Sequence, residues 1–150
     1  MPLPRTALTC RYLSYVLPNT NPPVHLRLPL LHVRLSLGKS SLTTIGLVDS
    51  GSTTTFIPLE IAEMLGLPIE KKDSAIGAGG RFQNTIRKVN IAILKVNKSL
   101  AQFPNFPVYV PTEADRIPYV VLGRDSIFRK FDIVFRENLK KIVLRTPKKK

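Results

Sequence analysis

The stretch Leu47-Val48-Asp49-Ser50-Gly51-Ser52-Thr53 decides which fold we expect for this chain of 150 residues. Its two leading apolar residues predict the end of a buried strand, and the carboxylate of Asp49 follows directly. Gly51 permits backbone conformations that a side chain would block, so we expect Asp49 on a tight loop. Backbone N–H groups in such a loop can hold a carboxylate. The Asp-Ser-Gly tripeptide alone is more often an ordinary turn at a strand end, so its interpretation depends on the surrounding sequence.

Strands are predicted on both sides of this loop. Residues 24–37 alternate in places between apolar and polar side chains, which is the pattern of a half-buried strand. A turn at 38–41 follows, and residues 42–48 return as a second strand that leads into Asp49. The other expected strands are short apolar runs between turn residues, at 12–17, 89–96, 106–110, 119–122, 131–135 and 141–145.

Two short helices complete the predicted elements. Residues 58–65 place Pro58 in the first turn and are followed by Gly66, a good C-terminal stop. Residues 126–130 form the second candidate helix, with Asp125 or Ser126 as its cap. We therefore expect a mainly β domain over residues 24–145. An irregular proline-rich N-terminal extension (1–23) and a basic tail (146–150) flank it.

The composition is that of a globular protein. Hydrophobic residues make up 43% of the chain and the mean hydropathy is +0.04. The sequence holds no uninterrupted apolar run of about 18 residues, so we expect no membrane span. The N-terminus lacks the compact apolar segment of a secretory signal. Cys10 is the single cysteine, which excludes an intrachain disulfide and favours a reducing, cytoplasmic location.

The net charge of +13 is the strongest anomaly, and most of it lies from Ile76 onward. Such a charge favours acidic partners, including nucleic acid or anionic lipid. A solvated basic surface with a basic tail is the more common explanation of such a charge, and no nucleic-acid-binding motif is present. His25 and His32 have no spaced Cys or His partners, so we expect no metal site, and no motif calls for a cofactor.

The chemistry of a loop aspartate becomes specific when two such carboxylates meet. Two close carboxylates cannot both ionise easily, so they share one proton. One then acts as a base on water while the other donates a proton to the scissile carbonyl. No other acidic residue of this chain lies in a second Asp-Ser/Thr-Gly setting. This hypothesis therefore requires a second chain, and a homodimer is the expected assembly.

Three motifs together resemble the retropepsin-like aspartic peptidases, the single-lobed and dimeric relatives of the pepsins. The segment 47–52 is similar to the catalytic loop of that family. Ala75-Ile76-Gly77-Ala78-Gly79-Gly80 resembles its glycine-rich flap, and Val120-Val121-Leu122-Gly123-Arg124-Asp125 resembles the motif that supports the catalytic loop. The resemblance covers residues 24–144. It implies a closed β-barrel protomer with one or two short helices.

The resemblance also implies roles for single residues. Asp49 would be half of the catalytic dyad, and Ser50 would lock the two catalytic loops together. Gly51 would shape the loop, and Ser52 would hydrogen-bond the Asp49 carboxylate. The residues of the other two motifs would bind substrate or support the loop: Ile76, Gly77, Ala78, Gly79 and Gly80 in the flap, and Leu122, Gly123, Arg124 and Asp125 below the loop.

The sequence departs from the viral members of this family at two places. Those proteins carry an acidic residue where this chain has Thr53, so Arg124 needs another partner, for which Asp125 or a C-terminal carboxylate are candidates. The N-terminal extension is longer and the chain ends in Lys148-Lys149-Lys150, which leaves the dimer interface open. The leading expectation is a homodimeric aspartic endopeptidase that cleaves a peptide or protein substrate. The alternative is a non-catalytic binding or assembly module that uses its basic surface for nucleic acid or an acidic partner.

Overall fold

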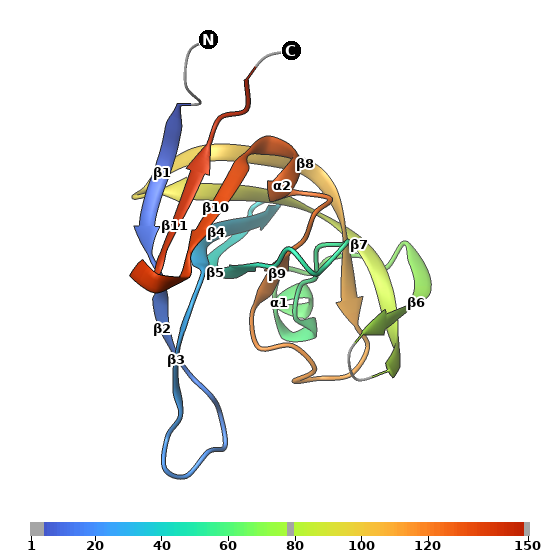
Figure 1. The fold of residues 1–150 in the computed structure, drawn as a ribbon. Coiled ribbons are helices and arrows are strands. Elements are labelled where there is room, and N and C mark those ends of the chain that lie inside the picture. The colour runs from blue at the N-terminus through green and yellow to red at the C-terminus, as the bar shows by residue number, and fades with distance from the viewer. Residues whose placement is uncertain (1–4, 78–79, 149–150) are drawn as a thin grey trace.

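The computed structural model describes residues 5–77 and 80–148, and β-strands make up most of it (Figure 1). The largest sheet has the order β6-β7-β4-β5-β9, with β8 also paired to β7. Its strands are β4 (Leu30–Leu37), β5 (Ser40–Val48), β6 (Lys71–Gly77), β7 (Gly80–Lys95), β8 (Lys98–Pro111) and β9 (Val120–Leu122). This confirms the mainly β prediction.

The β4–β5 hairpin carries the chain into the Asp49 loop, as the alternating pattern predicted. Val33 and Leu35 of β4 are fully buried, while His32 and Arg34, which alternate with them, are exposed. β5 pairs in antiparallel fashion with β4 and in parallel with β9. The expected strand over residues 24–37 is divided at Pro29 into β3 (His25–Leu28) and β4. Proline lacks the N–H that a continuous ladder needs.

β7 and β8 are longer than the sequence predicted. β8 runs through Pro104, Pro107 and Pro111, which we expected to bracket a shorter strand. Among the described strands β8 pairs only with β7, from Lys98 to Pro111, and such an edge position is where a sheet tolerates proline. β7 is long enough to pair with β6 near its start and with β4 near its end.

The predicted closed barrel is not confirmed, because the described strands form an open sheet. The short segment around Phe56 bridges β8 and β9, which do not pair with each other among the described strands. The Phe56 N–H donates to the carbonyl of Val121 over 2.9 Å, and the Ile57 N–H donates to that of Tyr109 over 2.9 Å. These single bridges bring β8 and β9 beside the segment that follows the Asp49 loop.

Both predicted helices are present and short. α1 (Leu59–Met64) begins after Pro58 and is followed by Gly66, which has a φ of +65°. α2 (Ile127–Lys130) follows β9 and is followed by β10 (Asp132–Arg136), and the turn η1 (Glu137–Leu139) precedes β11 (Lys141–Arg145).

Arg87 attaches α1 to the sheet. Its side chain is 4% exposed, and its guanidinium lies 3.1 Å from the Glu63 carboxylate and donates to the Leu67 carbonyl over 3.0 Å. The helix α1, which follows the Asp49 loop in the chain, is therefore fastened to β7. A buried guanidinium is tolerated here because several acceptors satisfy it.

The N-terminal extension differs from its prediction. We expected residues 1–23 to be irregular, but β1 (Thr6–Arg11) pairs with β11 in a three-stranded sheet of order β1-β11-β10. Tyr12 is 4% exposed and belongs to the hydrophobic core. β2 (Leu13–Val16) lies in the expected short strand and pairs with β3. Among the described residues, no helix is long and apolar enough to cross a membrane.

Candidate active site

The backbone on both sides of Asp49 is held by neighbouring segments. The Val48 N–H donates to the Pro29 carbonyl over 3.0 Å, and the Asp49 N–H donates to the Leu122 carbonyl over 3.1 Å. Asp49 therefore leaves β5 between the residue before β4 and the end of β9. This position fixes where its carboxylate can point.

The carboxylate of Asp49 is half-buried and is held by its own loop. Its Oδ1 accepts a 2.9 Å hydrogen bond from the Gly51 N–H. The residue after Asp49, Ser50, is exposed. The hydroxyl of Ser52 donates to the carbonyl of Thr54 over 2.7 Å, and not to the Asp49 carboxylate as the family resemblance implied. The Gly51 N–H takes the role that we expected of Ser52.

Gly123 lies directly against the Asp49 loop. A Cβ on this residue would lie 2.1 Å from the carbonyl oxygen of Thr54 and 3.0 Å from that of Ser52. Glycine is therefore required for the close approach of the two segments. The next residue, Arg124, donates its backbone N–H to the Ser52 carbonyl over 2.8 Å. The structure thus brings the two motifs together as the sequence predicted.

Thr55 connects the loop to the supporting motif, and the sequence had not singled it out. Its buried hydroxyl donates to Asp125 Oδ1 over 2.7 Å and accepts from the Gly123 N–H over 3.2 Å. It also lies 2.7 Å from the hydroxyl of Ser126. The carboxylate of Asp125 is consequently bound to Thr55. None of the ion pairs among residues 5–77 and 80–148 includes Arg124.

The Asp49 loop forms one wall of a cleft of about 540 Å³. β6 contributes Ser74, Ala75 and Ile76 to the same cleft, so the expected flap strand and the expected catalytic loop line one cavity. The cleft is lined by Asp49, Gly51, Ser52, Thr53, Thr54, Phe56, Ser74, Ala75, Ile76, Phe82 and Tyr109. Ile76 is 78% exposed near the end of β6. Gly80, which begins β7, has a φ of +98°, and the predicted flap residues Ala78 and Gly79 lie outside the described residues.

Three aromatic rings give the cleft an apolar side. The ring of Phe56 lies 5.7 Å from that of Tyr109 and 6.0 Å from that of Phe82. The guanidinium of Arg116 lies 5.0 Å from the centre of the Phe82 ring. A cleft of this kind suits a peptide. The aromatic rings can pack against apolar side chains of the peptide, and polar groups of the cleft can hydrogen-bond to its backbone. Aromatic residues at 56 and 109 were not predicted as site residues, because single aromatic residues in strands usually belong to the core.

A hydrogen bond ties the flap strand to β8. The Tyr109 hydroxyl donates to Asp73 Oδ2 over 3.1 Å, and the Ser74 N–H donates to Asp73 Oδ1 over 2.7 Å. The Ser74 N–H first, and the Tyr109 hydroxyl second, lower the pKa of Asp73 below its usual value. These two hydrogen bonds thus favour the ionised form of the Asp73 carboxylate.

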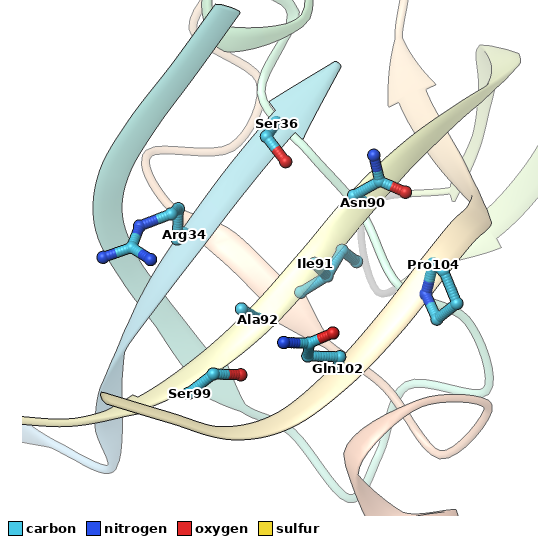
Figure 2. Close-up of a pocket in the computed structure, with 8 residues that line it drawn as sticks. All are labelled: Arg34, Ser36, Asn90, Ile91, Ala92, Ser99, Gln102 and Pro104. Atoms are coloured by element: carbon cyan, nitrogen blue, oxygen red, sulfur yellow. The ribbon is translucent and has the colours of Figure 1, made fainter. Parts of the chain in front are cut away.

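A second groove, of about 330 Å³, lies on the sheet where β4, β7 and β8 run side by side (Figure 2). Its lining residues carry hydroxyl, amide, apolar and one guanidinium groups: Arg34, Ser36, Asn90, Ile91, Ala92, Ser99, Gln102 and Pro104. These residues include no carboxylate, thiol or imidazole. The groove therefore lacks the acid and base groups for hydrolysis, and the Asp49 cleft is the better candidate active site.

The other titratable groups offer no competing site. Cys10 lies in β1, and burial raises the pKa of its thiol, which disfavours the reactive thiolate. Within the described residues, no three His, Cys, Asp or Glu side chains gather as a possible metal site.

The fold and the Asp49 loop can now be compared with those of known proteins. The model of a family described as aspartyl protease matches residues 33–126, which include the Asp49 loop, β6 and the supporting motif. The chain belongs to the aspartyl protease family. This confirms the resemblance to retropepsin-like aspartic peptidases that was drawn from the three motifs. No curated protein is significantly similar to the chain in sequence.

Three solved structures are among those similar to this chain. The EIAV protease in complex with an inhibitor is 21% identical, with a TM-score of 0.48, over 69% of this chain and 88% of that chain. A retropepsin-like aspartic protease from Rickettsia conorii is 16% identical, with a TM-score of 0.47, over 77% and 89%. The retroviral protease-like domain of Ddi1 from Leishmania major is 18% identical, with a TM-score of 0.44, over 81% and 97%.

Proposed function

We propose that this chain is an aspartic endopeptidase that acts as a homodimer, with one Asp49 from each chain. The observation that carries the proposal is the half-buried Asp49 carboxylate in a cleft, held by the Gly51 N–H 2.9 Å away. Membership of the aspartyl protease family supports it.

The need for a second chain follows from the lining of the cleft. Asp49 is the one carboxylate among the described residues that line it. Hydrolysis without a metal or a covalent intermediate needs a base that takes a proton from water and an acid that protonates the carbonyl oxygen. A second copy of Asp49 supplies the missing group when a two-fold axis passes between the loops. The exposed Ser50 would then meet its copy across that axis.

In the proposed reaction the two Asp49 carboxylates share one proton. The ionised carboxylate takes a proton from water, and the resulting hydroxide attacks the carbonyl carbon of the scissile peptide bond. The protonated carboxyl donates its proton to the carbonyl oxygen, which gives a tetrahedral intermediate. The carboxyl that took the proton from water then passes it to the amide nitrogen, and the other carboxylate takes a proton back from a hydroxyl of the intermediate. The C–N bond breaks as the C=O bond of the new carboxylic acid forms, and the pair again holds one proton.

The β6–β7 hairpin would act as the flap over the bound peptide. Ser74, Ala75 and Ile76 line the same cleft as Asp49 and offer backbone groups to an extended chain. An extended peptide can pair with the edge of such a strand, and its backbone N–H and C=O groups then form hydrogen bonds with the strand. The aromatic side of the cleft, with Phe56, Phe82 and Tyr109, would take apolar side chains of the substrate.

A non-catalytic binding module with the same fold is the alternative, and the net charge of +13 favours it. Such a module would bind nucleic acid or an acidic partner with strong salt dependence. We also propose a cytoplasmic location, which the single cysteine supports because no disulfide is needed for stability.

The test is cleavage of a mixed peptide library, followed by mass spectrometry. We expect wild-type protein to cleave and Asp49→Asn to be inactive, while circular dichroism shows that both are folded. Asp132→Asn is the matched control, because it removes an exposed carboxylate on β10 and should leave cleavage unchanged. Cleavage by a clean Asp49→Asn preparation at the wild-type rate would refute the mechanism. Salt-sensitive nucleic-acid binding without any cleavage would favour the alternative module.

A further inference from the structure

The β2–β3 hairpin extends away from the other strands of the molecule (Figure 1). β2 and β3 form a two-stranded sheet, and residues 17–24 join them. Among the described strands, each of these two pairs only with the other. A two-stranded hairpin alone is marginally stable in water, so further contacts are needed to hold it.

The two faces of this hairpin differ sharply. Leu13 is paired with Leu28 and Tyr15 with Leu26, and the Leu17 N–H continues this register by donating to the Val24 carbonyl over 2.9 Å. Directly opposed residues of an antiparallel pair point to the same face. We call this face the apolar arm face, and it consists of Leu13, Tyr15, Leu17, Val24, Leu26 and Leu28.

The other face is mixed, and it offers a control. It carries Ser14 opposite Arg27 and Val16 opposite His25. Val16 is 47% exposed, and Val24 on the apolar arm face is 41% exposed. The same side chain with nearly the same exposure therefore occurs once on each face.

The apolar arm face lies outside the interior of this protomer. Among the described residues, the hydrophobic core and the side chains packed against it include none of its six members. Val24 is exposed and the other five members are half-buried, so this face keeps apolar surface that a further contact would cover.

The position of this face relative to the catalytic loop suggests what covers it. The ring of Tyr15 meets that of Tyr119 edge to face, with centroids 5.3 Å apart. Tyr119 directly precedes β9, whose Leu122 carbonyl accepts the Asp49 N–H. Burial first, and then the charges of Tyr15 and Asp49, raise the pKa of Tyr119. The apolar arm face thus begins beside Asp49 and continues outward from the protomer.

We infer that the apolar arm face packs against a second copy of this chain, in the same dimer that brings the two Asp49 loops together. This inference rests on the proposed function, which places the second copy next to Asp49, where the arm begins. Each chain carries a net charge of +13, so two copies repel one another. Burial of apolar surface favours association and can outweigh this repulsion. The apolar arm face supplies such a surface.

The test compares Val24→Asp with Val16→Asp in the full chain. Sedimentation equilibrium gives the dimer Kd of each variant and of wild type. We expect Val24→Asp to raise the Kd by about tenfold or more, because a charge would be buried in an apolar contact. Val16→Asp should leave the Kd within about twofold, as exposed substitutions usually do. Both valines are exposed, so circular dichroism should show both variants folded.

Three results would overturn the inference. These are an equal Kd for the two variants, a wild-type chain that stays monomeric at every concentration, and an unchanged Kd with a raised KM for peptides in Val24→Asp. The last would show that substrate covers this face. Asp49→Asn in the same experiment separates the two proposals. If it cleaves peptide while Val24→Asp weakens the dimer, the peptidase mechanism fails and the arm contact stands.

Discussion

The α-carbon of Gly123 and the carbonyl oxygen of Thr54 are so close that a Cβ on the glycine would lie 2.1 Å from that oxygen. This oxygen belongs to the backbone of Thr54, so it cannot move away by a change of rotamer as a side-chain atom can. Gly123 thereby sets the distance between the β9 end and the loop that presents Asp49. The position of Asp49 depends on this contact.

The first prediction concerns this contact. Gly123→Ala should push the two segments apart, destabilise the fold by about 1–3 kcal/mol and reduce cleavage more than stability alone explains. Urea unfolding and peptide cleavage measure the two effects. Gly46→Ala is the comparison, because its Cβ would meet side-chain atoms of Leu122 at 3.2 Å, a far smaller overlap than the 2.1 Å approach to backbone at Gly123. Equal effects of the two substitutions would show that the close backbone contact is unimportant.

The second prediction concerns Thr55. Thr55→Val keeps the shape but removes the hydroxyl that donates to Asp125 and accepts from the Gly123 N–H. A buried group without its partner costs about 1–3 kcal/mol, so the free energy of unfolding should fall by that amount. Thr53→Val changes an exposed threonine of the same loop and should have little effect. If both variants unfold at the same urea concentration, the Thr55 contacts do not stabilise the loop.

The third prediction uses the pKa of Asp73. The Ser74 N–H, followed by the Tyr109 hydroxyl, lowers this pKa from its usual value of 3.8. Because the folded-state pKa is depressed, these bonds stabilise the protein above pH 3.8, and the contribution is lost as pH falls through the lowered pKa. Tyr109→Phe should move the pKa upward without fully restoring it, since the Ser74 N–H remains. Carboxyl NMR titration measures this, with Tyr119→Phe as the unaffected control.

The fourth prediction concerns the pH dependence of cleavage. A pair of carboxylates that shares one proton loses activity when that proton is removed, so kcat/KM should fall as pH rises above the acid range. It should also fall at very low pH, where both carboxyls are protonated. A pH profile with a library-derived peptide measures both limbs. Activity that rises steadily into alkaline pH would contradict a shared proton.

Much of the fold followed from local sequence patterns. The β4–β5 hairpin, α1, α2 and the final β10–β11 hairpin lie where periodicity and turn residues predicted them. Patterns failed where pairing between distant segments decides the structure. β1 forms because β11 is beside it, although its own sequence follows prolines and looks irregular. β8 extends through three prolines because its long ladder with β7, a pairing between segments that local patterns do not show, holds it from Lys98 to Pro111.

The site was predicted in part for the same reason. The Asp49 loop, the flap strand and Gly123 carry recognisable residues at recognisable spacing. Thr55 and Tyr109 carry no such signal, because their partners, Asp125 and Asp73, are far away in the sequence. The hydroxyl of Ser52 has a different partner from the one implied, since the Thr54 carbonyl is within its reach.

Subunit mixing tests the central claim, that catalysis needs one Asp49 from each of two chains. Wild type and Asp49→Asn are mixed in varying ratios at constant total concentration, well above the dimer Kd, and allowed to exchange. If both carboxylates are required, cleavage falls with the square of the wild-type fraction, because mixed dimers are inactive. Asp132→Asn in place of Asp49→Asn should leave cleavage unchanged at every ratio. A linear fall with the wild-type fraction would contradict the shared dyad, because each chain would then be active alone.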